Sequence, residues 1–285
     1  MKIQDIIKKY NKKIDPLDLE LLIAFALKKP REFVLAHPET PITPKQLLRI
    51  DNYIDRRAKE EPLAYILGQK EFYRLNFKVN ESTLIPRPET ELMVTELLNL
   101  NPKNATIIDV GTGSGNIIIS LAKNLTGKNK LIALDISKKA LAIAKQNAKI
   151  YNVDKKIKFF KSDLLMLMLT SKKYKPANKK LLIVANLPYL SQKIYGDAPA
   201  SVRKFEPRLA LLSRTNGLAH YKKLLMQIRS LKSQFSSLHV SCFMEISPEQ
   251  KTNLCNILGN LFPNEKAMCH RDLTGRWRIC QISLN

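Results

Sequence analysis

With 285 residues, of which 45% are hydrophobic, the chain is long enough to bury a real core and is expected to fold as a soluble globular protein. It has no apolar run near the roughly 18 residues of a membrane span, and its start, at Met1, lacks the layout of an export signal, so we expect a cytoplasmic protein with no membrane partner. A net charge of +23 favours a polyanionic partner, either RNA or an acidic protein surface, but a solvated lysine-rich surface explains it equally well.

The four cysteines predict neither a metal site nor a disulfide framework. They lack the Cys-x-x-Cys spacing of such sites, and no paired histidines lie near them in the chain. Reduced thiols also fit a cytoplasmic protein. We therefore expect no structural metal, and we expect Cys280 to serve buried packing. The other three are Cys242, Cys255 and Cys269.

Up to about residue 60 the pattern is helical throughout. Asp15-Pro16 forms a good N-cap and first-turn pair for a helix that ends before Pro30, and a short helix follows at about 32–36. Thr43-Pro44 begins another helix, in which apolar residues recur at near-helical spacing. Residues 1–70 are therefore expected to form a small helical domain without catalytic residues, which serves partner recognition or structural support.

The period changes from helical to alternating after this domain. Apolar and polar side chains alternate from Leu75 to Val79, residues 80–82 have a turn composition, and residues 83–85 can return as a second strand. We interpret residues 71–86 as a β-hairpin linker between two domains.

The segment Ile85-Pro86-Arg87-Pro88-Glu89-Thr90-Glu91 opens a helix that runs to about Leu100. Two prolines fix its start, and two carboxylates lie in its first turn, where they favour the positive end of the helix dipole. Helix capping alone explains these two acids. An equally good interpretation is that the segment forms one wall of an active site.

A glycine-rich loop follows the buried strand expected at 106–110. Three of the nine glycines fall in Gly111-Thr112-Gly113-Ser114-Gly115, just before a helix, which indicates close backbone approach to a ligand. The dinucleotide fingerprint would need glycine where this chain has Asn116. A Gly-x-Gly-x-Gly after a strand that carries Asp109 instead resembles motif I of the class I S-adenosylmethionine-dependent methyltransferases.

Acidic residues end the next two strands. Asp135 follows a strand expected at 131–134, about 20 residues beyond the glycine loop, where a carboxylate suits the two hydroxyls of a ribose. A helix N-cap is an equally good reading of Asp135. Asp163 and Leu164 follow a strand at 157–160, and the methyltransferase resemblance implies that they face the adenine of the cofactor. By position alone, Asp163 would be a surface turn residue.

The apolar run 181–185 ends in Asn186-Leu187-Pro188-Tyr189. A buried strand ended by a proline turn is the plain explanation, but the order of strand, glycine loop and two acids upstream favours an active site. The Asn186 side-chain oxygen and the Leu187 carbonyl can each accept one N–H of a planar NH₂ group, which turns its lone pair toward a methyl donor. Pro188 would stiffen the turn, and Tyr189 offers a face for stacking. The motif does not choose between adenine, cytosine, asparagine and glutamine.

The remaining segments complete an α/β domain. Residues 191–208 are expected to form a lid over the substrate, and a helix at 218–231 leads to the last two strands of the sheet, at 238–246 and 277–283. Methyltransferases of this class close the sheet with an antiparallel last strand. We therefore expect a Rossmann-like, seven-stranded methyltransferase domain over residues 87–285, preceded by the small all-α domain and the hairpin linker.

Several segments outside these motifs resemble the peptide chain release factor glutamine methyltransferases of the HemK/PrmC type. The segment 85–91 is the most specific of them, and the similarity spans essentially the whole chain. Asn-Leu-Pro-Tyr itself resembles the form found in ribosomal-RNA adenine dimethyltransferases, but those proteins share only the core motifs with this chain. The other matching segments are Glu61–Gly68, Phe72-Tyr73, His37–Thr40, Phe205–Pro207, Ala210-Leu211, Asn216–Leu218 and Asp272–Arg276.

The resemblance implies methylation of the side-chain amide nitrogen (N5) of the glutamine in the Gly-Gly-Gln loop of release factors, with S-adenosylmethionine as cofactor. It implies that residues 1–70 dock the factor, that Arg87 and Glu89 join residues 186–189 in binding it, and that the glycine loop, the two acids, Leu164 and Asn186 hold the cofactor. A monomer is expected. The chain has Leu187 where the family usually has proline and Ser247 where glycine is common.

Two alternatives stay open. Leu187 and the basic charge favour an RNA or DNA amino-methyltransferase acting on adenine, whereas a protein that has kept the fold without catalysis would only bind ligands. Nucleic acid is not the favoured partner.

Overall fold

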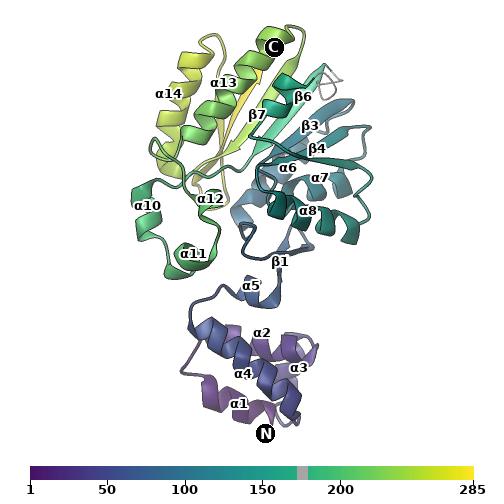
Figure 1. Ribbon diagram of the computed structural model, residues 1–285, viewed down its shortest axis with the longest axis vertical. Helices are drawn as coiled ribbons and strands as arrows, with labels where there is room; N and C mark the ends of the chain where they lie inside the picture. The colour runs from purple at the N-terminus through teal and green to yellow at the C-terminus, as the bar shows by residue number, and fades with distance from the viewer. Residues whose placement is uncertain (172–178) are drawn as a thin grey trace. The chain divides into compact units, whose positions relative to one another are not determined.

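The computed structural model describes residues 1–171 and 179–285, which form two compact units (Figure 1). The first unit comprises residues 1–69 together with 199–205, and the second comprises residues 70–198 and 206–285. Within the described residues, no helix is both long and apolar enough to cross a membrane.

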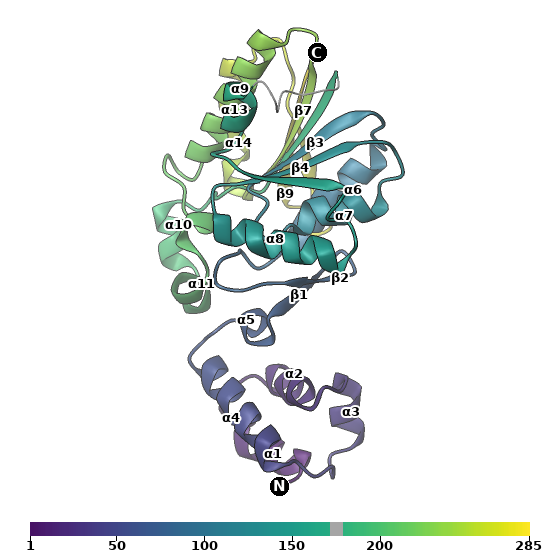
Figure 2. The same cartoon turned by 45° about the vertical axis from the view of Figure 1, so that its right-hand side comes forward.

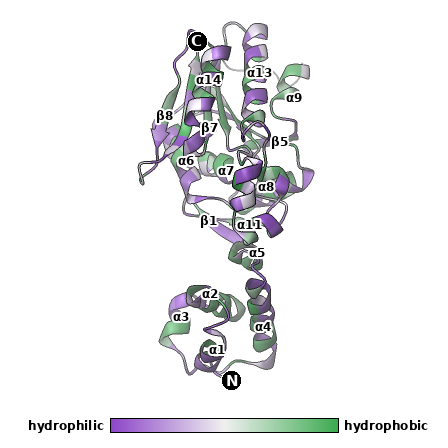
Figure 3. Ribbon diagram, turned by 90° about the vertical axis from the view of Figure 1, so that its left-hand side faces the viewer, coloured by the Kyte–Doolittle hydropathy of each residue, from purple (hydrophilic) through white to green (hydrophobic). Residues whose placement is uncertain are grey.

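The first unit is a small bundle of helices. Asp15 caps the second helix by accepting the N–H of Leu17 at 2.9 Å, and Thr43 and Gln46 form a capping box at the start of the fourth. The second helix is hydrophobic over most of its length and buries five residues (Figure 3). The helices are α1 (Ile3–Tyr10), α2 (Pro16–Leu27), α3 (Arg31–Ala36), α4 (Pro44–Ala58) and α5 (Leu63–Leu67).

The bundle has its own hydrophobic core. Ile23 of α2 packs there with Ile50 and Ile54 of α4 and with Ile3 of α1, and all four are fully buried. Helix α11 (Ala200–Phe205) belongs to this unit, and its Lys204 ammonium lies 2.7 Å from the Glu60 carboxylate.

The hairpin forms one strand earlier than expected. It pairs β1 (Gln69–Phe72) with β2 (Leu75–Lys78), so the prediction of a strand at 83–85 was wrong. The turn residues Tyr73 and Arg74 have φ of 48° and 61°, and the Glu91 carboxylate accepts the N–H of Tyr73 at 2.8 Å. Tyr73 and Arg74 can adopt positive φ, which usually favours glycine, because the distant Glu91 side chain accepts a backbone N–H of the turn.

The second unit is built on a seven-stranded sheet with the order β5-β4-β3-β6-β7-β9-β8. The five strands from β5 to β7 run parallel, and β9 pairs antiparallel with β7 as expected. These findings confirm the Rossmann-like fold. The strands are β3 (Ala105–Val110), β4 (Lys130–Asp135), β5 (Ile157–Lys161), β6 (Lys180–Ala185), β7 (His239–Glu245), β8 (Met268–Arg271) and β9 (Trp277–Leu284).

Helices cover both faces of the sheet (Figures 1 and 2). Alternate residues of β3 enter different cores: Ile107 packs with α6, α7 and α8, and Ile108 packs with α9, α13 and α14. A strand buried on both faces is apolar at every position, which is why its sequence shows no alternation. The helices are α6 (Glu91–Asn99), α7 (Asn116–Asn124), α8 (Lys138–Ile150), α9 (Met166–Thr170), α13 (Ala219–Gln234) and α14 (Lys251–Leu261).

Two elements near the end of the chain were not expected. The strand β8 forms the sheet edge beside β9, and the helix α14 packs against β9. Strand β8 is only four residues long and partly exposed, so it carries little periodic signal. The stretch expected as a lid contains α10 (Gln192–Asp197) and α11 and is followed by α12 (Arg208–Leu211); its role as a lid stays a prediction.

Candidate active site

The glycine loop joins β3 to α7 and lies against the turn after β6. Gly111, Gly113 and Gly115 all have positive φ, and the N–H groups of Gly111 and Thr112 bond to the Leu134 carbonyl at 2.8 and 2.9 Å. A Cβ on Gly111 would lie 3.0 Å from the Leu187 side chain. The loop therefore needs glycine both for its backbone conformation and for its close approach to residues 186–189.

Asp135 at the end of β4 is tied to this loop. Its Oδ2 accepts the Gly113 N–H at 2.9 Å, and its Oδ1 accepts the Ser137 N–H at 2.8 Å. Burial raises the pKa of the Asp135 carboxyl, and these backbone bonds act against that shift by favouring the ionised form. Each carboxylate oxygen keeps a lone pair for a further donor such as a ribose hydroxyl.

Asp109 is the second-last residue of β3, the strand directly before the glycine loop. Its Oδ2 accepts the Thr112 hydroxyl at 2.7 Å, which anchors the loop from below, and its Oδ1 is buried without a hydrogen-bond partner among the described residues. Burial raises the pKa of Asp109 to about 7. A carboxyl with a strongly raised pKa at a strand end is typical of functional sites.

A cavity of about 820 Å³ opens beside Asp163. Its size falls in the range that holds a cofactor, about 300 to 1,000 Å³. The Asp163 carboxylate pairs with the Lys223 ammonium at its wall, whereas Leu164 is buried in the core and has a φ of 52°. Other lining residues are Ile136, Ser191, Arg208, Ser213, Asn216 and His220.

The Asn186 side chain is oriented by a residue that sequence reasoning did not single out. Its Nδ2 donates to the Thr90 hydroxyl at 3.0 Å, and Thr90, whose exposed fraction is 1%, lies at the start of α6. Since the amide nitrogen is used in this bond, the amide oxygen keeps its lone pairs for an incoming N–H. The segment 85–91 thus contributes a residue that orients Asn186.

Thr90 also bonds to Glu245 at the end of β7, and the Tyr189 hydroxyl lies 3.5 Å from the same carboxyl. Burial raises the pKa of Glu245 to about 7 despite these bonds and raises that of Tyr189 well above its ordinary value. Glu245 was also missed, although a single acid in the apolar run 238–246 was a signal that could have revealed it.

Leu187 makes a bond that proline cannot make. Its N–H donates to the Tyr221 hydroxyl at 3.2 Å, and that hydroxyl contacts the carbonyls of Ala185 and Glu245. Tyr221 is fully buried in α13 and so links the turn after β6 to the end of β7. Leucine in place of the usual proline therefore adds a backbone N–H, and the Tyr221 hydroxyl accepts it.

Arg87 and Glu89 lie in different surroundings. The Arg87 guanidinium pairs with the buried Glu206 carboxylate, which also accepts the Ile85 N–H at 3.1 Å, so this arginine holds the segment in place. Glu89 lies 3.8 Å from the Arg278 guanidinium and lines a cavity of about 690 Å³ with residues of α6 and of the loop 272–276. That cavity is distinct from the one beside Asp163.

Comparison with known proteins decides the family. Residues 3–68 match a family model described as the PrmC N-terminal domain, and residues 101–256 match a methyltransferase domain. The release factor glutamine methyltransferase of Enterococcus faecalis is 35% identical over 85% of this chain and 82% of its own length. The chain belongs to the release factor glutamine methyltransferases. This confirms the family resemblance seen in the sequence.

Other members of the family match at similar levels. The one from Dictyoglomus turgidum is 33% identical over 97% of this chain and 94% of its own length. Among solved structures, the hMettl16 catalytic domain in complex with MAT2A 3′UTR hairpin 6 has a TM-score of 0.54 at 18% identity and covers 82% of each chain. The human methyltransferase 10 domain containing protein has a TM-score of 0.51 at 15% identity, over 75% of this chain and 89% of that one. These structures support the fold alone.

Proposed function

We propose that this chain transfers a methyl group from S-adenosylmethionine to the side-chain amide nitrogen (N5) of the glutamine in the Gly-Gly-Gln motif of peptide chain release factors. The observation that carries the proposal is the Asn186 amide, whose nitrogen is held by Thr90 at 3.0 Å beside the glycine loop, in a member of this family. An amide oxygen oriented in this way can accept an N–H of a planar NH₂ group.

The residues around the loop fit the cofactor. Asp135 is attached to the loop and retains acceptor capacity for the ribose. Asp163 lines a cavity of suitable size for the adenine end, and Leu164 directly follows it in the chain. The loop 111–115 and Asn186 would approach the remaining part. When bound, this cofactor supplies an electrophilic methyl group on a positively charged sulfur.

The residues after β6 prepare the nucleophile. The Asn186 side-chain oxygen accepts one N–H of the glutamine amide, and the Leu187 carbonyl accepts the other. Holding both hydrogens on one side turns the nitrogen lone pair outward and stabilises the positive charge that develops on nitrogen. Pro188 stiffens the turn, and Tyr189, held near Glu245, supplies a face for the planar amide. The proton that nitrogen then carries in excess passes to water.

The remaining parts of the chain recognise the protein substrate. We assign docking of the release factor to the helical unit, positioning of the segment 85–91 to Arg87, and contact with the substrate to Glu89. The enzyme works as a monomer in the cytoplasm, where peptide release takes place. A nucleic acid substrate is the second candidate, favoured by the net charge of +23.

Parallel assays distinguish these substrates. The chain is incubated with labelled S-adenosylmethionine and a purified release factor, a Gly-Gly-Gln→Gly-Gly-Ala version of that factor, or total RNA. We expect label in the intact factor only. Label in RNA but not in the factor would contradict the proposal, and equal label in both versions of the factor would place the methyl group on another residue.

A further inference from the structure

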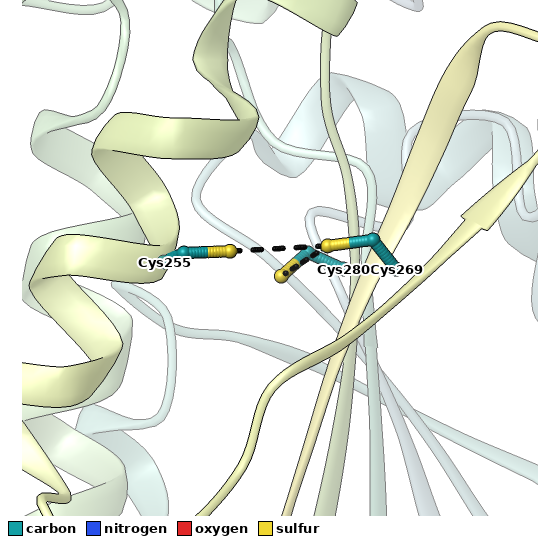
Figure 4. Close-up of side chains that lie close together, drawn as sticks. All are labelled: Cys255, Cys269 and Cys280. Atoms are coloured by element: carbon teal, nitrogen blue, oxygen red, sulfur yellow. Dashed lines mark hydrogen bonds between the residues drawn. The ribbon is translucent and has the colours of Figure 1, made fainter.

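Three cysteines meet between α14 and the antiparallel edge of the sheet (Figure 4). The Sγ atoms of Cys255 and Cys269 lie 3.9 Å apart, those of Cys269 and Cys280 lie 3.4 Å apart, and all three lie within 4.8 Å of one another. Figure 4 shows Cys255 reaching from the helix toward the two strand cysteines. None of the three belongs to the methyl-transfer site described above.

The topology explains why the sequence hides this cluster. Cys269 in β8 and Cys280 in β9 are direct partners in the antiparallel register, so their side chains stand on the same face of the sheet. Cys255 lies on α14, which packs against β9. Metal-site rules that rely on Cys-x-x-Cys spacing cannot detect ligands that three separate elements supply.

The sulfur separations match a trithiolate metal site. A tetrahedral metal with bonds of about 2.3 Å to three sulfurs keeps those sulfurs about 3.8 Å apart. The separations of 3.4 and 3.9 Å and the limit of 4.8 Å lie around this value, so small side-chain adjustments would complete the geometry. Because the three sulfurs already lie within 4.8 Å of one another, the site needs side-chain adjustments and no change of strand or helix position.

Burial and charge at the cluster also suit a bound cation. Cys280 is fully buried, whereas Cys255 and Cys269 are partly exposed, which provides shielding on one side and an entry path on the other. Thiolates are soft ligands that select Zn²⁺ or Cu⁺ over Mg²⁺ or Ca²⁺. Three thiolates and a divalent ion leave one negative charge. Lys251, one helical turn before Cys255, holds its ammonium over the Trp277 ring, and its positive charge acts on Cys255 and Cys269.

We propose that Cys255, Cys269 and Cys280 form a binding site for one soft divalent cation of the Zn²⁺ type, with water or another ligand in the fourth position. The bound ion joins α14 to β8 and β9 and so stabilises the C-terminal edge of the sheet. It takes no part in methyl transfer.

Zinc titration of the full chain, reduced and kept free of oxygen, tests the proposal. We expect one Zn²⁺ per chain for the wild type, and at least about 100-fold weaker binding after Cys255→Ser, Cys269→Ser or Cys280→Ser, because each removes a direct ligand. Cys242→Ser is the matched control: Cys242 is fully buried in β7 but outside the cluster, so its loss should leave zinc affinity unchanged.

Two further measurements identify the ligands and check the fold. Titration with Cd²⁺ should produce a thiolate charge-transfer band in the wild type and in Cys242→Ser, and a weaker band in each cluster variant. Cys255→Ser changes a partly exposed helix residue, so it should retain its circular dichroism spectrum and its melting temperature without metal. Zn²⁺ should raise the melting temperature of the wild type and not that of this variant.

Three results would overturn the proposal. The first is equal zinc affinity in the wild type and in a folded Cys255→Ser variant, which would place the ion elsewhere. The second is a loss of binding in Cys242→Ser equal to that in the cluster variants. The third is the absence of zinc binding by the reduced wild type while mass spectrometry finds a Cys269–Cys280 disulfide in air, which would make this pair a redox couple instead.

Discussion

At the scale of single residues, the site depends on polar groups that orient one another. The Thr90 hydroxyl accepts the Asn186 amide N–H and bonds to Glu245, and Glu245 lies near Tyr189, so four side chains from three parts of the chain form one network. Removing one side chain from a buried network costs more free energy than one hydrogen bond contributes, because its former partners are left buried without a hydrogen bond.

Asn186 and Asp135 should separate catalysis from cofactor binding. Asn186→Ala removes an acceptor proposed to act on developing charge, so we expect kcat to fall about 100-fold or more, with only a modest rise in the Kd for S-adenosylmethionine. Asp135→Ala should instead weaken that Kd strongly, because in the proposed role the carboxylate binds the ribose hydroxyls, and it also holds Gly113. Calorimetry and steady-state kinetics measure both quantities, and the opposite pattern would overturn the two assignments.

Thr90 should act on turnover through Asn186. Thr90→Val keeps the volume of the buried side chain and removes the hydroxyl, so Asn186 can rotate, and we expect kcat to fall about 10-fold, equivalent to roughly 1.4 kcal/mol. KM for the release factor should stay near its original value. Thr90→Ser retains the hydroxyl and should restore most of kcat; a serine variant as slow as the valine variant would indicate a packing role only.

Glu245 should make stability fall as the pH rises toward neutrality. Burial raises its pKa from an ordinary 4.5 to about 7, so the folded chain holds a proton that the unfolded chain releases between these values. The resulting stabilisation is complete below pH 4.5 and is lost as the pH rises through 7.

Glu245→Gln removes this titration. Urea unfolding should be measured at several pH values between 5 and 8. Across this range the free energy of unfolding of the variant should rise by about 2 to 3 kcal/mol relative to that of the wild type. Glu249→Gln, a change at an exposed acid nearby, should leave the wild-type slope unchanged. Parallel curves for the wild type and Glu245→Gln would show that Glu245 titrates normally.

At the scale of elements, the ends of neighbouring strands bring the functional groups together. The glycine loop follows β3, Asp135 ends β4 and Asn186 follows β6, and in a parallel sheet these ends meet at one edge. A turn from a distant part of the chain supports them. The Gln250 side chain donates to the carbonyls of Tyr189 and Asn216 at 2.8 and 3.2 Å, and so connects three loops.

Gly217 should be indispensable to that connection. It has a φ of 86°, and an added Cβ would lie 2.0 Å from the Tyr189 carbonyl and 2.3 Å from the Gln250 amide. Gly217→Ala should therefore lower the free energy of unfolding by about 2 kcal/mol or more and displace Tyr189, with a loss of kcat. Gly259→Ala is the control, since nothing lies within 4 Å of its Cβ in α14, and it should stabilise by up to about 1 kcal/mol. Equal effects of the two changes would contradict this explanation.

At the scale of the whole molecule, the helical unit has its own core and leaves apolar side chains exposed. The exposed fraction of Leu48 in α4 is 73%, which is higher than that of the other exposed large apolar residues of this unit, such as Leu17 and Leu35. An exposed leucine on a unit without catalytic groups fits the proposed docking of the release factor. In that proposal, Leu48 would give the whole-protein substrate a contact that an isolated Gly-Gly-Gln peptide lacks.

Leu48→Glu should therefore raise KM for the intact release factor about 10-fold, equivalent to roughly 1.4 kcal/mol of binding, and leave kcat unchanged. KM for a short Gly-Gly-Gln peptide should not change. Leu100→Glu, at a leucine with an exposed fraction of 52% after α6, is the matched control and should affect neither. An unchanged KM for the intact factor would remove Leu48 from the docking surface.

Local patterns in the sequence determined the elements and the cofactor motif. The caps at Asp15 and Thr43, the apolar run of β3 and the glycine loop all depend on neighbours within a few residues, and the family followed from short segments such as 85–91. The sequence predicted the hairpin at the wrong place because the backbone N–H of Tyr73 in its turn donates to Glu91, which lies 18 residues away.

Tertiary structure alone decided which distant groups meet. The bond from Asn186 to Thr90 spans 96 residues, and the cysteine cluster joins a helix to two strands. Such contacts depend on strand order and helix packing, which no local periodicity encodes. The sequence therefore determined the type of reaction and the residue types that serve it, whereas the fold decided how Asn186 is oriented and brought three separate thiols to one point.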